Sequence, residues 1–299
     1  TIIATAEDLY KKCGLKETTT MAIEIPVAKG VDIYIMEGET ITDIVIPSKI
    51  DGLPVHYIGG EAFKNKGLTS TIIPSSITYI GEDAFSNNNL TNITIPNSIE
   101  VIADSAFANN NLTSVTIPKS VTDIGECAFM SNQLTSLELP NAPIFIASAA
   151  FNDNQLPDNH AFIYARNDDG SIDNTTVVSY GGAKRDNITL PTNITNIYHE
   201  AFLNNNITSI DLGNNLKRIG FDAFTGNNLT SVYIPRVVEI YDDAFTKNAE
   251  SNPNLTLIEH RSCLEFYWYD IIGIHRDNAY PFNSGTIEHE LGNITVTSN

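Results

Sequence analysis

Eight copies of the dipeptide Ala-Phe recur in phase at a nearly constant interval, and this repeat constrains the fold more than any other feature of the sequence. Most successive copies are 22 residues apart, one gap is 51 residues and the last is 21. A fixed period in this range indicates supersecondary units that stack on one another, because one such unit cannot bury its apolar side alone. The phenylalanines are Phe63, Phe85, Phe107, Phe129, Phe151, Phe202, Phe224 and Phe245.

One unit, residues 112–133, reads LTSVTIPKSVTDIGECAFMSNQ. Its first half predicts a short strand over Ser114–Ile117, with Val115 facing inward, and the following proline ends that strand because it lacks a backbone N–H. A second apolar pair then turns inward, and Gly125 permits a tight bend. The Ala-Phe pair is expected on a short helical or 3-10 turn, with Phe129 in the interior.

An asparagine precedes the first Leu or Ile of most units by two residues. A structural ladder is the favoured interpretation, in which each amide bonds the backbone of its own turn and of the next coil, because the column follows the repeat and not one locus. A metal or glycan site is the alternative. The column consists of Asn88, Asn110, Asn132, Asn154, Asn205 and Asn227.

The flanks and one interruption depart from the repeat. Residues 1–40 and 251–299 are expected to cap the two ends, since an open solenoid end would expose its core. The repeats then occupy residues 41–250, in about eight coils of 22 residues, with a β-hairpin inserted at 156–184. The aromatic run at 266–269 is interpreted as a hydrophobic plug of the C-terminal cap; an aromatic platform for a sugar or peptide is the alternative.

The flanks and the hairpin contain residues that could belong to a metal or catalytic site. The string NDDGSID (167–173) predicts a hairpin turn, because a calcium loop needs a bidentate carboxylate farther downstream. His260, Cys263, His275 and His289 lack the spacing of a zinc site, and a Cys–His nucleophile pair is the weakest hypothesis. We therefore expect no catalytic residue, no metal and no cofactor, and no disulfide on which the fold depends.

Charge excludes one class of partner. Lys and Arg total 17 and Asp and Glu total 36, so the net charge is −19. Binding to nucleic acid or to an anionic membrane surface needs a positive footprint, which this chain lacks. No apolar stretch approaches the length of a membrane span.

The unit LTSVTIPxSVTxIGxxAFxxN resembles the BspA-like, or Treponema pallidum-type, leucine-rich repeat, over about Ile41 to Asn248 with one interruption. The resemblance implies an α/β leucine-rich-repeat solenoid, a right-handed superhelix of short parallel strands capped at both ends. It also implies a non-enzymatic protein, secreted or displayed on a bacterial cell surface, and adhesins are among such proteins.

The predicted binding site is the concave sheet face, whose outward positions vary from coil to coil while the inward ones repeat. It carries carboxylates near its centre and could accept a protein segment with a basic patch, from a host matrix or bacterial surface protein. The alternative function is a recognition arm of a larger enzyme or effector, with catalysis elsewhere. The candidate residues are Ile72, Asn92, Thr94, Ser114, Thr116, Ser136, Glu138, Ser209, Asp211 and Tyr233.

Overall fold

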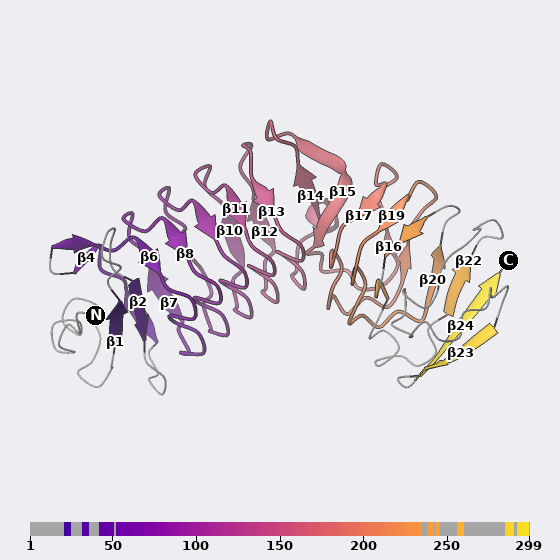
Figure 1. Ribbon diagram of the computed structural model, residues 1–299, viewed down its shortest axis with the longest axis horizontal. Coiled ribbons are helices and arrows are strands. Elements are labelled where there is room, and N and C mark those ends of the chain that lie inside the picture. Colours follow the sequence, from indigo (N-terminus) through magenta and orange to yellow (C-terminus); the bar gives the residue numbers. More distant parts are fainter. Residues whose placement is uncertain are drawn as a thin grey trace. The chain divides into compact units, whose positions relative to one another are not determined.

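The structure is a computed structural model (Figure 1). It describes the backbone of five terminal strands, at residues 21–24, 32–35, 256–259, 285–289 and 292–298, and the complete residues 42–50, 52–234, 238–241 and 243–245. The aromatic run at 266–269, and His260, Cys263 and His275, lie outside these residues. His289 belongs to a strand of which only the backbone is described.

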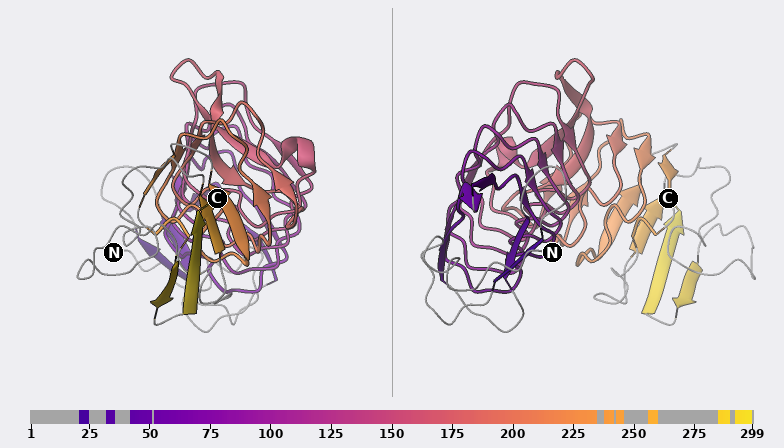
Figure 2. Two further views of the ribbon diagram at one scale, coloured as in Figure 1. Left: turned by 90° about the vertical axis from the view of Figure 1, so that its right-hand side faces the viewer. Right: turned by 60° about the vertical axis from the view of Figure 1, so that its left-hand side comes forward.

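The chain forms two compact units, each of which is a β-solenoid. Unit 1 comprises residues 1–156 and 166–171, and unit 2 comprises residues 157–165 and 172–299. The predicted solenoid is therefore confirmed. In unit 1 the successive coils lie one beside the next, as the right-hand view of Figure 2 shows.

The strand predicted in each repeat is present in most coils, and parallel pairs join it to the next coil. In unit 1, β3 (Asp43–Val45) pairs with β7 (Ser70–Ile72), and β10 (Ser114–Thr116) pairs with β12 (Ser136–Glu138). Val115 is buried between exposed neighbours, so one side of the strand faces the core. These first strands place the candidate binding residues on the outer side.

A second sheet, which the sequence analysis did not predict, is the more continuous of the two in unit 1. Each of its central strands has only two residues, too few for an alternating pattern to be recognised in the sequence. All its pairs are parallel except β1 with β2. In order, it contains β1 (Met21–Glu24), β2 (Asp32–Ile35), β6 (Tyr57–Ile58), β8 (Tyr79–Ile80), β9 (Val101–Ile102), β11 (Asp123–Ile124) and β13 (Phe145–Ile146). A small antiparallel pair, β4 (Lys49–Ile50) with β5 (Leu53–Pro54), precedes β6.

Unit 2 repeats this two-sheet arrangement. Its first strands are β16 (Ile188–Thr189) paired with β18 (Ile210–Asp211), and a four-stranded sheet of β20 (Ser231–Ile234), β22 (Thr256–Glu259), β24 (Gly292–Ser298) and β23 (Gly285–His289). The second sheet contains β14 (Phe162–Arg166), β15 (Ile172–Tyr180), β17 (Asn196–Ile197), β19 (Arg218–Ile219) and β21 (Glu239–Ile240). Because β15 pairs in parallel with β17, the second hairpin strand is part of this sheet.

The predicted α/β class with helical or 3-10 turns is wrong, because the Ala-Phe segment is not helical. Within the described residues the one helical element is a three-residue 3-10 turn, η1 (Asp158–His160). Around Phe85 the chain makes two β-turns: Ala84 N donates to Gly81 O at 3.1 Å and Ser86 N to Asp83 O at 3.0 Å. Asp83 and Asn87 have positive φ angles of 56° and 55°.

The Ala-Phe segment is not helical because its other N–H groups point toward the next coil. Those of Asp83, Phe85 and Asn87 donate to carbonyl oxygens of the next coil, at 2.8–2.9 Å. A helix would direct every N–H along its own axis and leave the neighbouring coil without donors. The left-handed conformations of Asp83 and Asn87 turn alternate N–H groups toward the adjacent coil.

A stack of aromatic rings fills the core of each unit. In unit 1 the ring centroids of Phe63, Phe85, Phe107, Phe129 and Phe151 are 5.1–5.3 Å apart in succession, and the rings are nearly parallel. In unit 2 the stack begins with a tyrosine: the Tyr180 ring lies 5.2 Å from Phe202, followed by Phe224 and Phe245. Tyr180, at the end of β15, thus occupies the position that phenylalanine holds elsewhere.

The asparagine column joins neighbouring coils through both ends of each amide. Asn110 Nδ2 donates to Phe85 O of the preceding coil at 2.9 Å and to Phe107 O of its own coil at 3.2 Å, and its Oδ1 accepts from Leu90 N at 3.0 Å. The partner outside the coil is thus the preceding coil and not the next one. Asn88, Asn132, Asn154 and Asn227 repeat this pattern.

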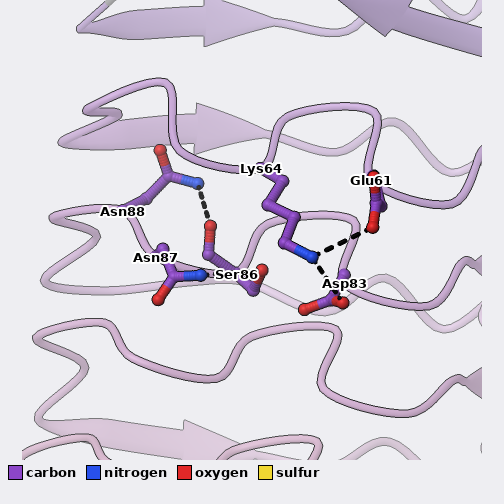
Figure 3. A network of polar contacts seen from close by, with 6 residues as sticks. All are labelled: Glu61, Lys64, Asp83, Ser86, Asn87 and Asn88. Atoms are coloured by element: carbon purple, nitrogen blue, oxygen red, sulfur yellow. Dashed lines mark hydrogen bonds and ion pairs between the residues drawn. The ribbon is translucent and has the colours of Figure 1, made fainter.

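Outside this column, a surface ion pair also bridges two coils (Figure 3). Lys64 Nζ lies 3.0 Å from a Glu61 oxygen in its own coil and 2.8 Å from an Asp83 oxygen in the next. The hydrogen bond to Asp83 is the main reason that the pKa of Lys64 lies above its usual value. The pair is partly exposed to solvent, so the buried Asn88 amide beside it in Figure 3 is the stronger link.

We expect Phe107→Ala to lower the free energy of unfolding by about 3–5 kcal/mol, because it leaves a cavity between two stacked rings. Phe145→Ala is the matched control: its side chain is 59% exposed, so its effect should stay within about 0.5 kcal/mol. Urea unfolding followed by circular dichroism measures both. Equal effects of the two substitutions would contradict the stacked core.

A second stability test concerns the asparagine column. Asn110→Ala should cost about 1–3 kcal/mol for each buried backbone group that it leaves without a partner. Asn111→Ala, which removes an exposed amide from the next residue, should change the midpoint of thermal unfolding little. If Asn110→Ala unfolds at the same temperature as Asn111→Ala, the column does not join the coils energetically.

Candidate functional site

The outward side chains of the first strands form what we call the first-strand face. In unit 1 it contains β3, β7, β10, β12 and the segment 92–94. All the candidate residues of this unit are exposed, and the apolar Ile72 is 62% exposed. They are Ile72, Asn92, Thr94, Ser114, Thr116, Ser136 and Glu138.

In unit 2 the first-strand face contains β16, β18 and β20. Asp211 and Tyr233 are exposed, whereas Ser209 is half-buried. The Ser209 hydroxyl accepts a 2.6 Å hydrogen bond from Asn187 N of the preceding coil, which gives it a structural role. Asp211 Oδ1 accepts from Gly213 N at 2.9 Å and lies opposite Thr189 in the parallel register.

Carboxylates give the unit 1 part of this face its charge. Asp43 accepts hydrogen bonds from the Ser70 hydroxyl at 2.5 Å and the Thr42 hydroxyl at 3.0 Å, and these bonds hold the pKa of Asp43 below its usual value. Glu138 accepts from the Thr116 hydroxyl across the β10–β12 pair at 3.3 Å. Among the described outward positions of these strands none is basic.

In the hairpin turn at 167–173, for which a calcium loop was the alternative, the Asp169 carboxylate bonds to groups of the turn itself. Asp169 Oδ1 accepts from the Ser171 hydroxyl at 2.6 Å and from Ser171 N at 2.9 Å, which lowers the pKa of Asp169. Gly170 provides the positive φ of 85° that the turn requires. Among the residues that the structure describes, no group of three or more His, Cys, Asp and Glu side chains is arranged to hold a metal ion.

The insertion creates a cavity of about 330 Å³ within unit 2. Tyr180 lies on its wall, and its hydroxyl donates to Lys184 O at 2.9 Å. Burial is the main reason that the pKa of Tyr180 rises to about 12. The lining residues are Asp158, Asn159, Ala161, Phe162, Tyr164, Tyr180, Lys184, Ile188, Thr189 and Pro191.

Tyr180 gives the stability of unit 2 a defined alkaline dependence. The folded state holds the phenol proton more tightly than the unfolded state, whose pKa is near 10.0, so the folded state binds more protons between pH 10 and about 12. We expect stability to fall as pH rises through this window. Urea unfolding of wild type and Tyr180→Phe measures the effect, and the variant should lose less stability. Equal losses would contradict it.

Four side chains that the sequence analysis did not single out form a contiguous aromatic group on the second sheet of unit 2: Tyr198, His199, Phe221 and Tyr241. The sequence repeat contains a signal for this aromatic group. From β6 to β13 in unit 1 the position after the second-strand isoleucine is Gly or Ala, yet in unit 2 it is tyrosine at Tyr198 and Tyr241. The feature was missed because the second strand itself was not predicted.

The repeat matches one family model, described as a BspA type leucine rich repeat region, in six copies over residues 29–158 and 178–263. No curated protein matches the chain significantly. No helix in the described part of the chain has the length and apolar character needed to cross a bilayer.

Several solved structures are similar to this chain at low sequence identity. The pneumococcal vaccine antigen PcpA is 17% identical, with 82% of this chain and 80% of that chain covered and a TM-score of 0.49. A leucine-rich repeat protein from Bacteroides ovatus is 19% identical, with 81% and 69% covered and a TM-score of 0.44. A leucine-rich repeat protein of T. pallidum is 22% identical, with 77% and 86% covered and a TM-score of 0.36.

Proposed function

Because this chain belongs to the BspA-type leucine-rich-repeat family, we propose that it is a non-enzymatic protein-binding module of a secreted or cell-surface bacterial protein. Within that class we propose an adhesin, whose partner is a host matrix protein or a bacterial surface protein. The partner binds to the first-strand face, which we take as the concave side of the solenoid. Ile72, Glu138, Asp211 and Tyr233 are the residues proposed to contribute most.

The observation that carries this proposal is the contrast between the two sides of the first strands. Their inward residues are Val, Ile or Leu in the described coils except at Thr71, because every coil must fill the same interior. The outward residues change from Ile72 to Thr94, Thr116 and Glu138 in unit 1 and to Asp211 and Tyr233 in unit 2. An exposed position that the fold does not constrain can specify a partner.

The charge of the first-strand face indicates the chemistry of that partner. Asp43 and Glu138 lie on its unit 1 part and Asp211 on its unit 2 part, and each is exposed. A partner that presents Lys or Arg side chains would gain complementary contacts and faster encounter, whereas an acidic partner would be repelled. Exposed Ile72 and Tyr233 add apolar contact area, and aromatic side chains often dominate an interface.

The test uses charge reversal with a matched control. Glu138→Lys and Asp211→Lys should each slow association with a basic partner about tenfold or more at low salt, because complementary charge acts mainly on the association rate. Asp123→Lys makes the same charge change on the second sheet of unit 1, at an exposed position of β11, and should leave the rate nearly unchanged. Surface plasmon resonance against a panel of purified matrix and bacterial surface proteins measures these rates.

Two outcomes would contradict the proposal. If Asp123→Lys slows association as much as Glu138→Lys, the effect follows net charge and not the first-strand face. If all three variants bind like wild type while substitution of the exposed hairpin-turn residues Asn167 and Asp168 abolishes binding, the inserted hairpin is the site. Tyr233→Ala adds a charge-free test, since it should speed dissociation without altering the salt dependence.

A further inference from the structure

The aromatic group on the second sheet of unit 2 surrounds a cleft that the proposed function does not use. The ring centroids of Tyr198 and His199 are 4.6 Å apart, those of His199 and Phe221 are 5.0 Å apart, and those of Phe221 and Tyr241 are 4.9 Å apart. The guanidinium carbon of Arg218 lies 5.7 Å from the Tyr241 centroid. Phe221 and Tyr198 nevertheless remain 41% and 40% exposed.

The core does not require these rings. The stacked phenylalanines already fill the interior, and the positions of Tyr198 and Tyr241 are held in unit 1 by Gly59, Gly81, Ala103, Gly125 and Ala147. The next position carries Gly60, Glu82, Asp104, Glu126 and Ser148 there, but His199 and Phe221 in unit 2. Exposed aromatic side chains are gathered here at positions where the coils of unit 1 carry small or polar residues. They indicate a binding role, because the coils of unit 1 fold without them.

A cleft of about 300 Å³ lies among these residues, which we call the aromatic cleft. Gly220 lies between the two tyrosines in the column, and a Cβ there would come within 2.6 Å of His199 N, so the position must stay small. Gly220 itself lines the cleft. The lining residues are Thr176, Asn196, Ile197, Tyr198, His199, Arg218, Gly220, Phe221 and Tyr241.

Hydrogen bonds fix the groups around the cleft before any ligand arrives. Phe221 N donates to His199 Nδ1 at 3.0 Å, which leaves Nε2 as the donor nitrogen of that ring. Arg218 Nε donates to Glu239 Oε2 at 3.1 Å, and Asn196 Nδ2 donates to the Thr176 hydroxyl at 3.3 Å. The cleft therefore combines an apolar aromatic side with a rim of planar donors and acceptors that are held in place.

We propose that the aromatic cleft binds one or two pyranose rings of a neutral glycan. A sugar ring presents C–H groups on its faces and hydroxyls around its edge, which matches aromatic rings beside the guanidinium of Arg218 and the amide of Asn196. A purely apolar ligand would not use these hydrogen-bonding groups. The cleft volume lies at the small end of ligand sites, about 300–1,000 Å³.

Charge separates this ligand class from charged alternatives. Arg218 already covers the Tyr241 ring, so a cationic ligand would meet a fixed positive charge where its cation–π contact should form. An anionic glycan would approach a chain of net charge −19. The cleft belongs to the second sheet and the proposed protein-binding residues of unit 2 to the first strands, so the two proposals stand or fail separately.

The test is titration of the full chain with neutral trisaccharides, cellotriose, maltotriose and chitotriose, by isothermal calorimetry and saturation-transfer NMR. Sialyllactose and tetramethylammonium serve as the anionic and cationic comparison probes. We expect at least one neutral trisaccharide to bind and Phe221→Ala and Tyr198→Ala each to weaken that binding tenfold or more. Phe145→Ala removes an exposed ring from the second sheet of unit 1 and should change the affinity less than twofold.

Three results would overturn the proposal: no neutral trisaccharide binds, Phe221→Ala binds the sugar like wild type, or tetramethylammonium alone binds. Phe221 is exposed, so its substitution should not unfold the coil, and circular dichroism of each variant checks this. Asn196→Ala tests the rim independently and should also weaken sugar binding. Loss of sugar binding with unchanged binding to a protein partner would separate this site from the first-strand face.

Discussion

Hydrogen bonding between neighbouring coils is the constraint on which the rest of the structure depends. A coil of 22 residues contains too little regular structure to satisfy its own backbone, so its N–H groups donate to both neighbouring coils and its buried asparagine amide joins it to the preceding one. The positive φ angles at Asp83 and Asn87 make this possible, because they turn alternate N–H groups along the stack. The aromatic stack then fills the interior that these bonds enclose.

This arrangement separates the residues that build the protein from those that can bind. Inward positions repeat because every coil has the same interior, whereas outward positions contribute little to the fold. Function is therefore expected where an outward position departs from its column. On the first-strand face the outward residue changes from coil to coil, as at Ile72, Glu138 and Asp211. On the second sheet of unit 2, aromatic residues such as Tyr198 and Phe221 replace the small or polar residues that unit 1 has at the same positions.

The insertion shows how a break in the period can remain compatible with the stack. Phe151 and Phe202 are 51 residues apart instead of 22, yet β15 pairs in parallel with β17 and ends at Tyr180. Tyr180 stacks on Phe202 as a phenylalanine of the preceding coil would. Its hydroxyl is accommodated by the carbonyl of Lys184, so the extra polar group is satisfied at the edge of the core.

The sequence by itself determined the solenoid, its repeating core of phenylalanines, the first strands and the outward exposure of Glu138 and Asp211, because a fixed period repeats the same local physics in every coil. The tertiary structure alone decided the second sheet, the non-helical conformation of the Ala-Phe segments and the role of Tyr180. Two-residue strands and left-handed turns at residues such as Asp83 exist only because an adjacent coil accepts their N–H groups. The aromatic cleft likewise forms only when rings 22 residues apart are brought into contact by stacking.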